Sequence, residues 1–174
     1  MHFFEIFKKI SYGLDLLMRI STALLTAGFT LLIFTTVLSR YVFNFSILFS
    51  QEVSKLLFIW SCFFAATVAY KQLSHIRFEF AENFLGRKGV LLTDVLIHSL
   101  SFVFFGLIFV QSISFVRQIW QTYFPLIGIS QGWLYMSVLT SSIVFLFHNA
   151  AFLLDSLKAL NKWNEDEPAS DQQG

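Results

Sequence analysis

Two histidines are the residues of this sequence best placed for ligand chemistry. His98 and His148 each lie about one turn inside an apolar stretch, and two imidazoles at equal depth on neighbouring helices can ligate a haem iron. Polar side chains at that depth can instead form hydrogen bonds between helices, and Asn149 is a suitable partner. The residues alone leave both interpretations open.

A second set of polar residues surrounds another apolar stretch. Glu52 and Lys55 are three residues apart, so they can pair along one helical face, and Glu52 suits the positive end of a helix. His75 follows the same stretch, where an imidazole can bond lipid headgroups or backbone. Cys62 is the single cysteine, which excludes a disulfide within the chain, and its apolar neighbours predict an inert thiol.

These residues lie within or beside four long apolar stretches. Residues 20–39 contain no charged side chain, and at about 1.5 Å per helical residue such a run crosses a hydrocarbon layer of about 30 Å. The chain is 56% hydrophobic and 13% charged, whereas soluble domains average about a quarter charged residues. The sequence therefore predicts an all-α integral membrane protein with spans at about 20–38, 50–70, 95–116 and 132–154.

The distribution of Lys and Arg predicts the orientation of these spans, because cytoplasmic loops carry an excess of basic residues. Only Arg40, Lys55 and Arg117 fall on one side of the membrane, and nine basic residues fall on the other. We therefore expect both termini to be cytoplasmic. The nine residues are Lys8, Lys9, Arg19, Lys71, Arg77, Arg87, Lys88, Lys158 and Lys162.

Two segments outside the spans have the pattern of amphipathic helices that lie in the membrane interface. Residues 3–17 and 76–88 place apolar side chains at three- and four-residue spacing, with charged residues between them. The alternative is that each segment extends the neighbouring span into the cytoplasm. The predicted organisation is an interfacial segment at 1–19, a four-helix membrane domain at 20–155 and a polar cytoplasmic tail at 156–174.

The spans offer packing surfaces and lack the features of a solute pathway. Pro125 and Pro168, the only prolines, fall outside the spans, and no charged residue lies deep within one. We therefore expect no enzyme and no catalytic, substrate, metal or cofactor site, and the net charge of +1 predicts no nucleic-acid binding. Small residues that predict close contact between the first two spans are Thr22, Ala23, Thr26, Ala27 and Thr30, and Ser61, Ala65 and Ala69.

Short motifs give the sequence a resemblance to a known family. They are SRYVFN at 39–44, Glu52 followed by KLLFIW at 55–60, HIR at 75–77 and GISQGWLY at 128–135. In this order, over about residues 15–155, they resemble the small membrane subunit of tripartite ATP-independent periplasmic (TRAP) transporters. The chain departs from the family pattern at Gln51-Glu52, where two acidic residues are usual, at Ser130, where proline is usual, and at Phe78-Glu79, where a Val-Asp type pair is usual.

The resemblance implies a division of labour in the inner membrane of a bacterium. A large membrane subunit carries the sodium sites, the substrate site and the moving elevator domain, and a periplasmic binding protein delivers a carboxylate such as a C4-dicarboxylate or sialic acid. The small subunit is then a non-catalytic scaffold among membrane phospholipids. The residues we expect at contacts with these partners are Arg40, Glu52, Lys55, Trp60, His75, Arg117 and Trp133. A haem-bearing anchor of a respiratory enzyme, using His98 and His148, is the alternative function.

Overall fold

A computed structural model describes the backbone of residues 2–166 and the side chains of residues 11–72 and 89–159. Three helices make up the fold, α1 (His2–Val42), α2 (Ser50–Ile119) and α3 (Gly132–Asp166). Within the described residues, the prediction of an all-helical chain with four segments able to span a membrane is confirmed, and each segment extends beyond the expected bounds. The four segments long and apolar enough to cross a membrane are Ser11–Val42, Ser50–Gln72, Gly89–Ile119 and Gly132–Ala159.

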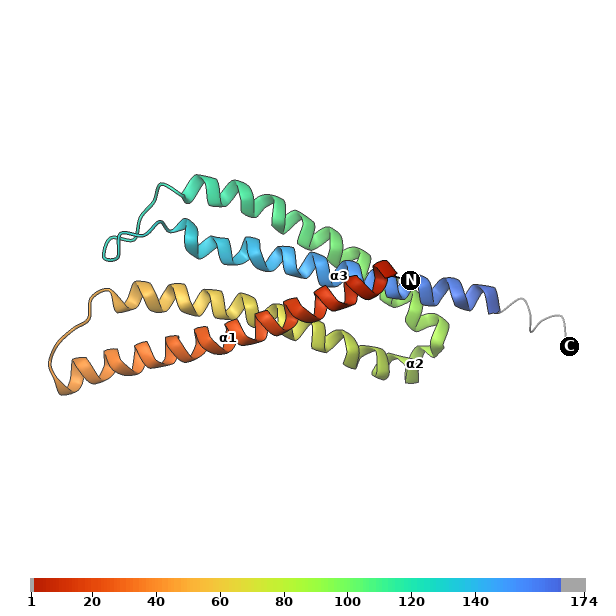
Figure 1. The fold of residues 1–174 in the computed structure, drawn as a ribbon, viewed down its shortest axis with the longest axis horizontal. Coiled ribbons are helices and arrows are strands. Elements are labelled where there is room, and N and C mark those ends of the chain that lie inside the picture. The colour runs from red at the N-terminus through yellow and green to blue at the C-terminus, as the bar shows by residue number, and fades with distance from the viewer. Residues whose placement is uncertain (1, 167–174) are drawn as a thin grey trace, which may run out of the picture.

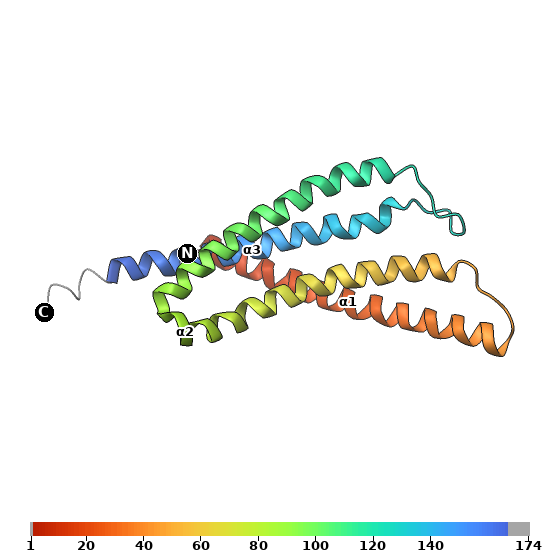
Figure 2. The ribbon, with the colours of Figure 1, turned by 180° about the vertical axis from the view of Figure 1, so that it is seen from behind.

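The second and third of these segments belong to one helix that doubles back on itself. Figure 1 shows α2 turning sharply near its middle, so that its first arm (Ser50–Gln72) and second arm (Gly89–Ile119) run in opposite directions. Seen from behind in Figure 2, the bend lies at the same end as the start of α1 and the end of α3. The first loop (43–49) and the second loop (120–131) lie together at the opposite end, here called the loop end.

Helix α1 ends where the backbone turns at Asn44. This residue has a φ of 51°, in the left-handed region that asparagine tolerates better than most residues. The turn brings Phe45 back to Ser39, since the Phe45 N–H donates to the Ser39 carbonyl at 3.0 Å and the Ser39 hydroxyl donates to the Phe45 carbonyl at 2.8 Å. The first loop therefore starts with a closed turn that directs the chain into α2.

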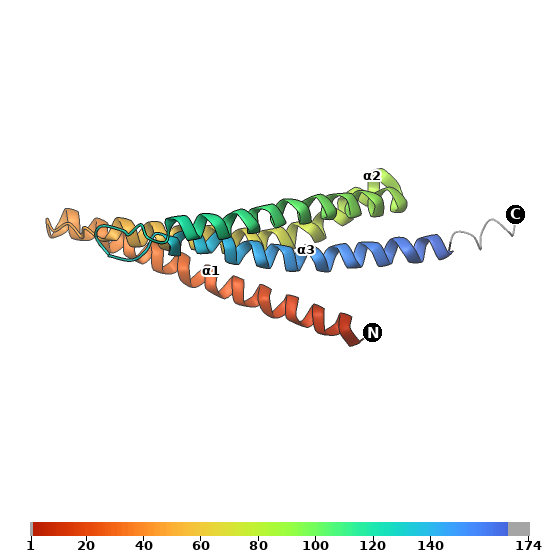
Figure 3. The ribbon, with the colours of Figure 1, turned by 90° about the horizontal axis from the view of Figure 1, so that it is seen from above.

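The segment before the first span is continuous with it. Helix α1 begins at His2 without a break, and Figure 3 shows its N-terminal half running away from the end of α3. Ser11 and Asp15 point inward and are buried, whereas Tyr12 and Leu17 are exposed. Residues 76–88 likewise lie within α2, at its bend, and their side chains fall outside the described residues. The location of both segments in the membrane interface stays a prediction.

The core forms where all three helices meet. Met18 of α1, Phe64 of α2 and Val144 of α3 are buried against one another, and Leu25 packs beside them. Burial of such side chains excludes lipid from the junction and fixes how the helices cross.

Small residues pack mainly between α2 and α3, which share the most extensive contact in the fold. On α3, Ser137 and Ser141 are almost fully buried, which lets the two backbones approach closely. Spans one and two do meet, through larger side chains such as Phe29 and Phe58, whose ring centroids lie 5.4 Å apart. The predicted stripes are wrong as the contact surface, because their exposed members include Ala23, Thr26, Ala27, Thr30, Ala65 and Ala69.

Candidate functional site

Glu52 holds the second loop against the first arm of α2. Its Oε2 accepts hydrogen bonds from the backbone N–H groups of Leu126 at 3.1 Å and Ile127 at 2.9 Å, and its Oε1 lies 3.2 Å from the Leu126 nitrogen. The loop presents these successive N–H groups because Gly128 adopts a φ of +69°, which a side chain would strain. A carboxylate is the natural partner for such a pair of donors.

The predicted pairing of Glu52 with Lys55 is therefore wrong. Among the described side chains, ion pairs join only Asp15 to Arg19 and Asp15 to Lys71. Lys55 is exposed on the first arm. A carboxylate gains more from two directed N–H donors than from one flexible surface ammonium, which explains the outcome.

Two tryptophans also connect the first arm of α2 to the chain beside the second loop. The Trp60 indole N–H donates to the Trp133 carbonyl at 2.9 Å, which ties the first arm of α2 to the start of α3. Both residues line an apolar groove of about 470 Å³ that also includes Leu25 and Ile129. The structure thus brings together three of the predicted site residues, Glu52, Trp60 and Trp133, around the second loop.

The second loop is also closely packed against itself. The Ser130 hydroxyl donates to the Trp120 carbonyl at 2.6 Å and accepts from the Gly132 N–H at 3.1 Å. A Cβ atom at Gly132 would lie 2.5 Å from the Trp120 ring, so only glycine fits there. The serine that stands in place of the usual proline therefore has its own role in closing the loop.

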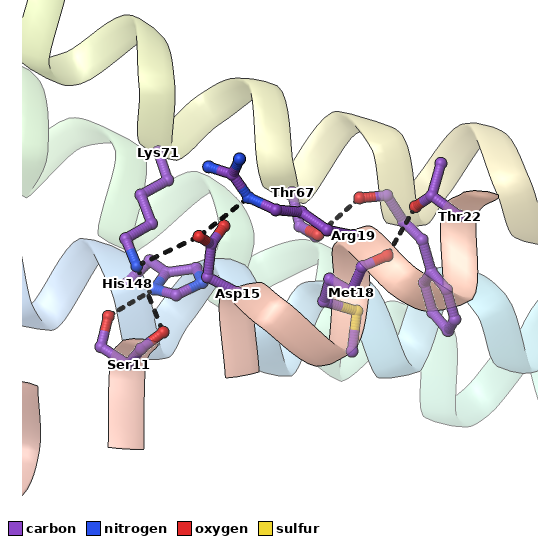
Figure 4. A network of polar contacts seen from close by, with 9 residues as sticks. Ser11, Asp15, Met18, Arg19, Thr22, Thr67, Lys71 and His148 are labelled. Carbon is purple, nitrogen blue, oxygen red and sulfur yellow. Dashed lines mark hydrogen bonds and ion pairs between the residues drawn. The ribbon is translucent and has the colours of Figure 1, made fainter. Parts of the chain in front are cut away.

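A cluster of polar residues joins all three helices near the other end (Figure 4). The Asp15 carboxylate lies 3.0 Å from Nε of Arg19 and 3.7 Å from Nζ of Lys71, and Lys71 also donates to the Ser11 carbonyl at 3.2 Å. The Ser11 hydroxyl meets Nδ1 of His148 at 3.0 Å. We call these five residues the Asp15 cluster.

Sequence reasoning missed the Asp15 cluster. It placed Asp15 on the solvent side of an interfacial helix, yet this residue is only 5% exposed. The available signal was the spacing of Ser11, Asp15 and Arg19, which lie four residues apart on one helical face and so form a polar stripe. Nothing in the spacing shows that Lys71 and His148 complete the cluster, because they come from other helices.

The other candidate histidine, His98, takes part in a separate network of hydrogen bonds. The Asn149 amide donates to the His98 carbonyl at 2.7 Å, so its oxygen faces Nδ1 of His98 at 2.9 Å. The Tyr70 hydroxyl donates to the same oxygen at 2.8 Å. Since an amide oxygen only accepts, Nδ1 of His98 carries the proton. The ring also stacks on Phe152, with centroids 5.3 Å apart.

These contacts support hydrogen bonding between helices as the role of both histidines. His98 binds Asn149 across the interface of α2 and α3, and His148 binds Ser11 across the interface of α3 and α1. The two imidazoles thus belong to different networks with different partners. Of the two interpretations that the residues left open, these contacts favour interhelical hydrogen bonding.

The remaining predicted site residues are not brought together. Arg40 and Arg117 are exposed in the last turns of α1 and α2, at the loop end. Lys55 is exposed near the start of α2. His75 lies in the part of α2 whose side chains fall outside the described residues. Trp133 is 47% exposed, so about half of this residue remains accessible beside the loop.

Most of this chain is similar in sequence to known proteins. Residues 29–159 match the family described as tripartite ATP-independent periplasmic transporters, DctQ component. The sialic acid TRAP transporter small permease protein SiaQ of Vibrio cholerae is 26% identical over 137 residues, which cover 78% of each chain. A candidate TRAP transporter small permease protein of Haemophilus influenzae is 29% identical over 148 residues, covering 81% of this chain and 86% of that one.

A third relative is much longer. The sialic acid TRAP transporter permease protein SiaT of Haemophilus influenzae is 30% identical over 114 residues, which cover 64% of this chain and 18% of that protein. The family match includes the loop held by Glu52, the Trp60–Trp133 contact and the network around Asn149. The chain is therefore a member of the DctQ family, the small permease subunits of TRAP transporters.

Proposed function

We propose that this chain is the non-catalytic scaffold subunit of a sodium-coupled TRAP importer that receives its substrate from a periplasmic binding protein. It packs against a large, elevator-type membrane subunit in the bacterial inner membrane, with both termini in the cytoplasm. The substrate is a carboxylate, either a C4-dicarboxylate or a sugar acid such as sialic acid.

The exposed apolar surface carries this proposal. In the most apolar windows of Ser11–Val42 and Gly89–Ile119, no residue is buried within the chain. Leu24 and Leu31 of α1 are 69% and 65% exposed, and Leu107 of α2 is 62% exposed. The polar side chains, by contrast, are largely used to hold the helices together, as in the Asp15 cluster. Such a bundle suits packing against lipid and a neighbouring membrane protein.

The longer relative supports a large membrane partner. In SiaT of Haemophilus influenzae the matching segment is 18% of a single permease chain, so a small-subunit segment and a much larger remainder are covalently joined there. We propose that the present chain stands beside a separate large subunit in the same way. The names of SiaQ and SiaT support a sugar acid as the substrate.

We also propose that the loop end contributes to contacts with the partners. Arg40, Lys55 and Arg117 are exposed charges at or near this end, and Trp133 is 47% exposed beside them. Charged and aromatic side chains of this kind favour recognition of a partner over packing in lipid. His75 is retained as a contact residue at the opposite end of the first arm.

Reconstitution tests the proposal. Liposomes that contain the large subunit and receive the binding protein should take up the carboxylate under a sodium gradient only when this chain is included. Replacement of sodium by potassium in the gradient is the control and should abolish uptake. Equal uptake without this chain, or uptake by this chain alone, would contradict the scaffold role.

A further inference from the structure

The second arm of α2 carries an exposed stripe with the spacing of a helix-packing surface. Consecutive members of the stripe are separated alternately by four and three residues. The mean repeat is therefore about 3.5 residues, which is the repeat at which one helix packs along another. Each member is 59% to 70% exposed. Ser114, the next position in this spacing, is exposed as well. The stripe consists of Leu96, Leu100, Val103, Leu107 and Val110.

Lipid alone could cover an apolar stripe, but this stripe is followed by polar residues toward the end of the helix. Gln111, Ser114 and Gln118 lie on the same side of the helix, at spacings of three and four residues, and all are exposed. The neighbouring Ser112 hydroxyl donates to the Ile108 carbonyl at 2.7 Å. Gln111, Ser114 and Gln118 form no side-chain hydrogen bond within the described part of the chain.

These polar side chains border a cavity of about 410 Å³ between the second arm of α2 and α3. Tyr135 lines it from α3, with its ring 4.8 Å from that of Phe115. Gln111 lies five residues, or about 7.5 Å, inside the expected end of this span at residue 116, so we expect its amide to lie within the hydrocarbon layer. An amide without a partner at that depth is costly.

The chemistry of the cavity restricts what can occupy it. Its amides and hydroxyls are neutral and supply both donors and acceptors, so they do not select a phosphate headgroup or an ion. The adjoining stripe runs along the length of the arm, which fits an occupant as long and as straight as a helix. A membrane helix that carries a neutral polar side chain meets both requirements.

We propose that this stripe is the docking face for one transmembrane helix of the large subunit, and that a neutral polar side chain of that helix enters the cavity and bonds Gln111. The inference rests on the proposed function, which supplies the large subunit. The apolar stripe provides the contact area, and Gln111 sets the register of the two helices, as a polar residue in an apolar seam does elsewhere.

Photo-crosslinking in the assembled transporter tests the docking face. A photoreactive benzoyl-phenylalanine at Leu107 should crosslink to the large subunit. Phe102 is the matched control, because it is exposed on the same helix but lies about 140° around it from Leu107. Equal crosslinking from Phe102, adducts with a second copy of this chain, or adducts with lipid alone at Leu107 would overturn the proposal.

A substitution tests the role of Gln111. The Gln111→Leu variant should bind the large subunit about tenfold more weakly, because the partner side chain loses its hydrogen bond. Gln72→Leu is the matched control, since Gln72 is an exposed glutamine on the first arm, at the end away from the loops. Unchanged binding of Gln111→Leu, in protein with unchanged helix content, would overturn this role.

The two proposals can fail separately. If Leu107 does not crosslink to the large subunit while omission of the chain still abolishes uptake, the docking face is wrong and the scaffold role stands. If the large subunit neither copurifies with the chain nor depends on it for uptake, the scaffold role and the docking face are both wrong.

Discussion

Glu52 and Ile127 are 75 residues apart in the sequence, yet the Ile127 N–H donates to the Glu52 carboxylate at 2.9 Å. This bond, together with that from Leu126, is how the first arm of α2 positions the loop that enters α3. The second loop therefore has a defined conformation at the loop end, where we expect the partners of the chain to bind.

Replacement of Glu52 should loosen the second loop. In Glu52→Gln the charge is lost and a single oxygen faces the two N–H donors, so amide hydrogen exchange in residues 120–131 should rise about tenfold, as expected for the loss of about 1.4 kcal/mol. Hydrogen-exchange mass spectrometry measures this. Lys55→Gln, which changes an exposed charge one turn away, should leave the exchange rate unchanged. Equal rates in the wild type and Glu52→Gln would contradict the contact.

Loss of the buried acid should destabilise the junction of α1 and α2. Asp15→Asn removes the carboxylate charge that faces the Lys71 ammonium, and the Lys71 side chain is only 18% exposed. The free energy of unfolding in detergent should fall by about 1–3 kcal/mol. Asp155→Asn changes a half-buried acid of α3 that forms no hydrogen bond or ion pair within the described residues, and it should have little effect. If Lys71→Met and Asp15→Asn destabilised the protein additively, the two residues would not be coupled.

The network around Asn149 should contribute to the packing of α2 against α3. Asn149→Leu removes the bonds to the Tyr70 hydroxyl and to Nδ1 and the backbone carbonyl of His98, and the free energy of unfolding should fall by about 2 kcal/mol. Ser99→Ala, at an exposed position next to His98, is the control. Unfolding in detergent compares the variants. A Soret band from the purified wild-type protein would assign the histidines to haem instead.

The packing of the second loop should resist any side chain at Gly132. In Gly132→Ala the new methyl group meets the Trp120 ring, so the ring or the loop must shift, and overpacking should cost about 1–3 kcal/mol. Gly106→Ala is the matched control within a helix, because nothing lies within 4 Å of its added Cβ. Equal melting temperatures for Gly132→Ala and Gly106→Ala would show that the second loop accommodates the methyl group without loss of stability.

The sequence by itself determined the four spans, the all-helical class and the family. Residues 20–39 are free of charge, and the length of such a run against the thickness of a bilayer is a local property. The positions of the two loops follow from the ends of these runs. The motifs around Arg40, Trp60 and Trp133 identify the family by their order alone, which needs no knowledge of contacts.

Only the tertiary structure decided which side chains meet. Asp15 was expected outside the bundle and is buried in it, and Glu52 was expected beside Lys55 and binds the second loop instead. Each contact depends on how far a helix is rotated and shifted against its neighbour. A rotation of one residue, about 100°, turns a buried side chain toward lipid. The apolar residues of the spans lie on every side of their helices, so the sequence pattern does not specify that rotation. Packing around Met18, Phe64 and Val144 specifies it.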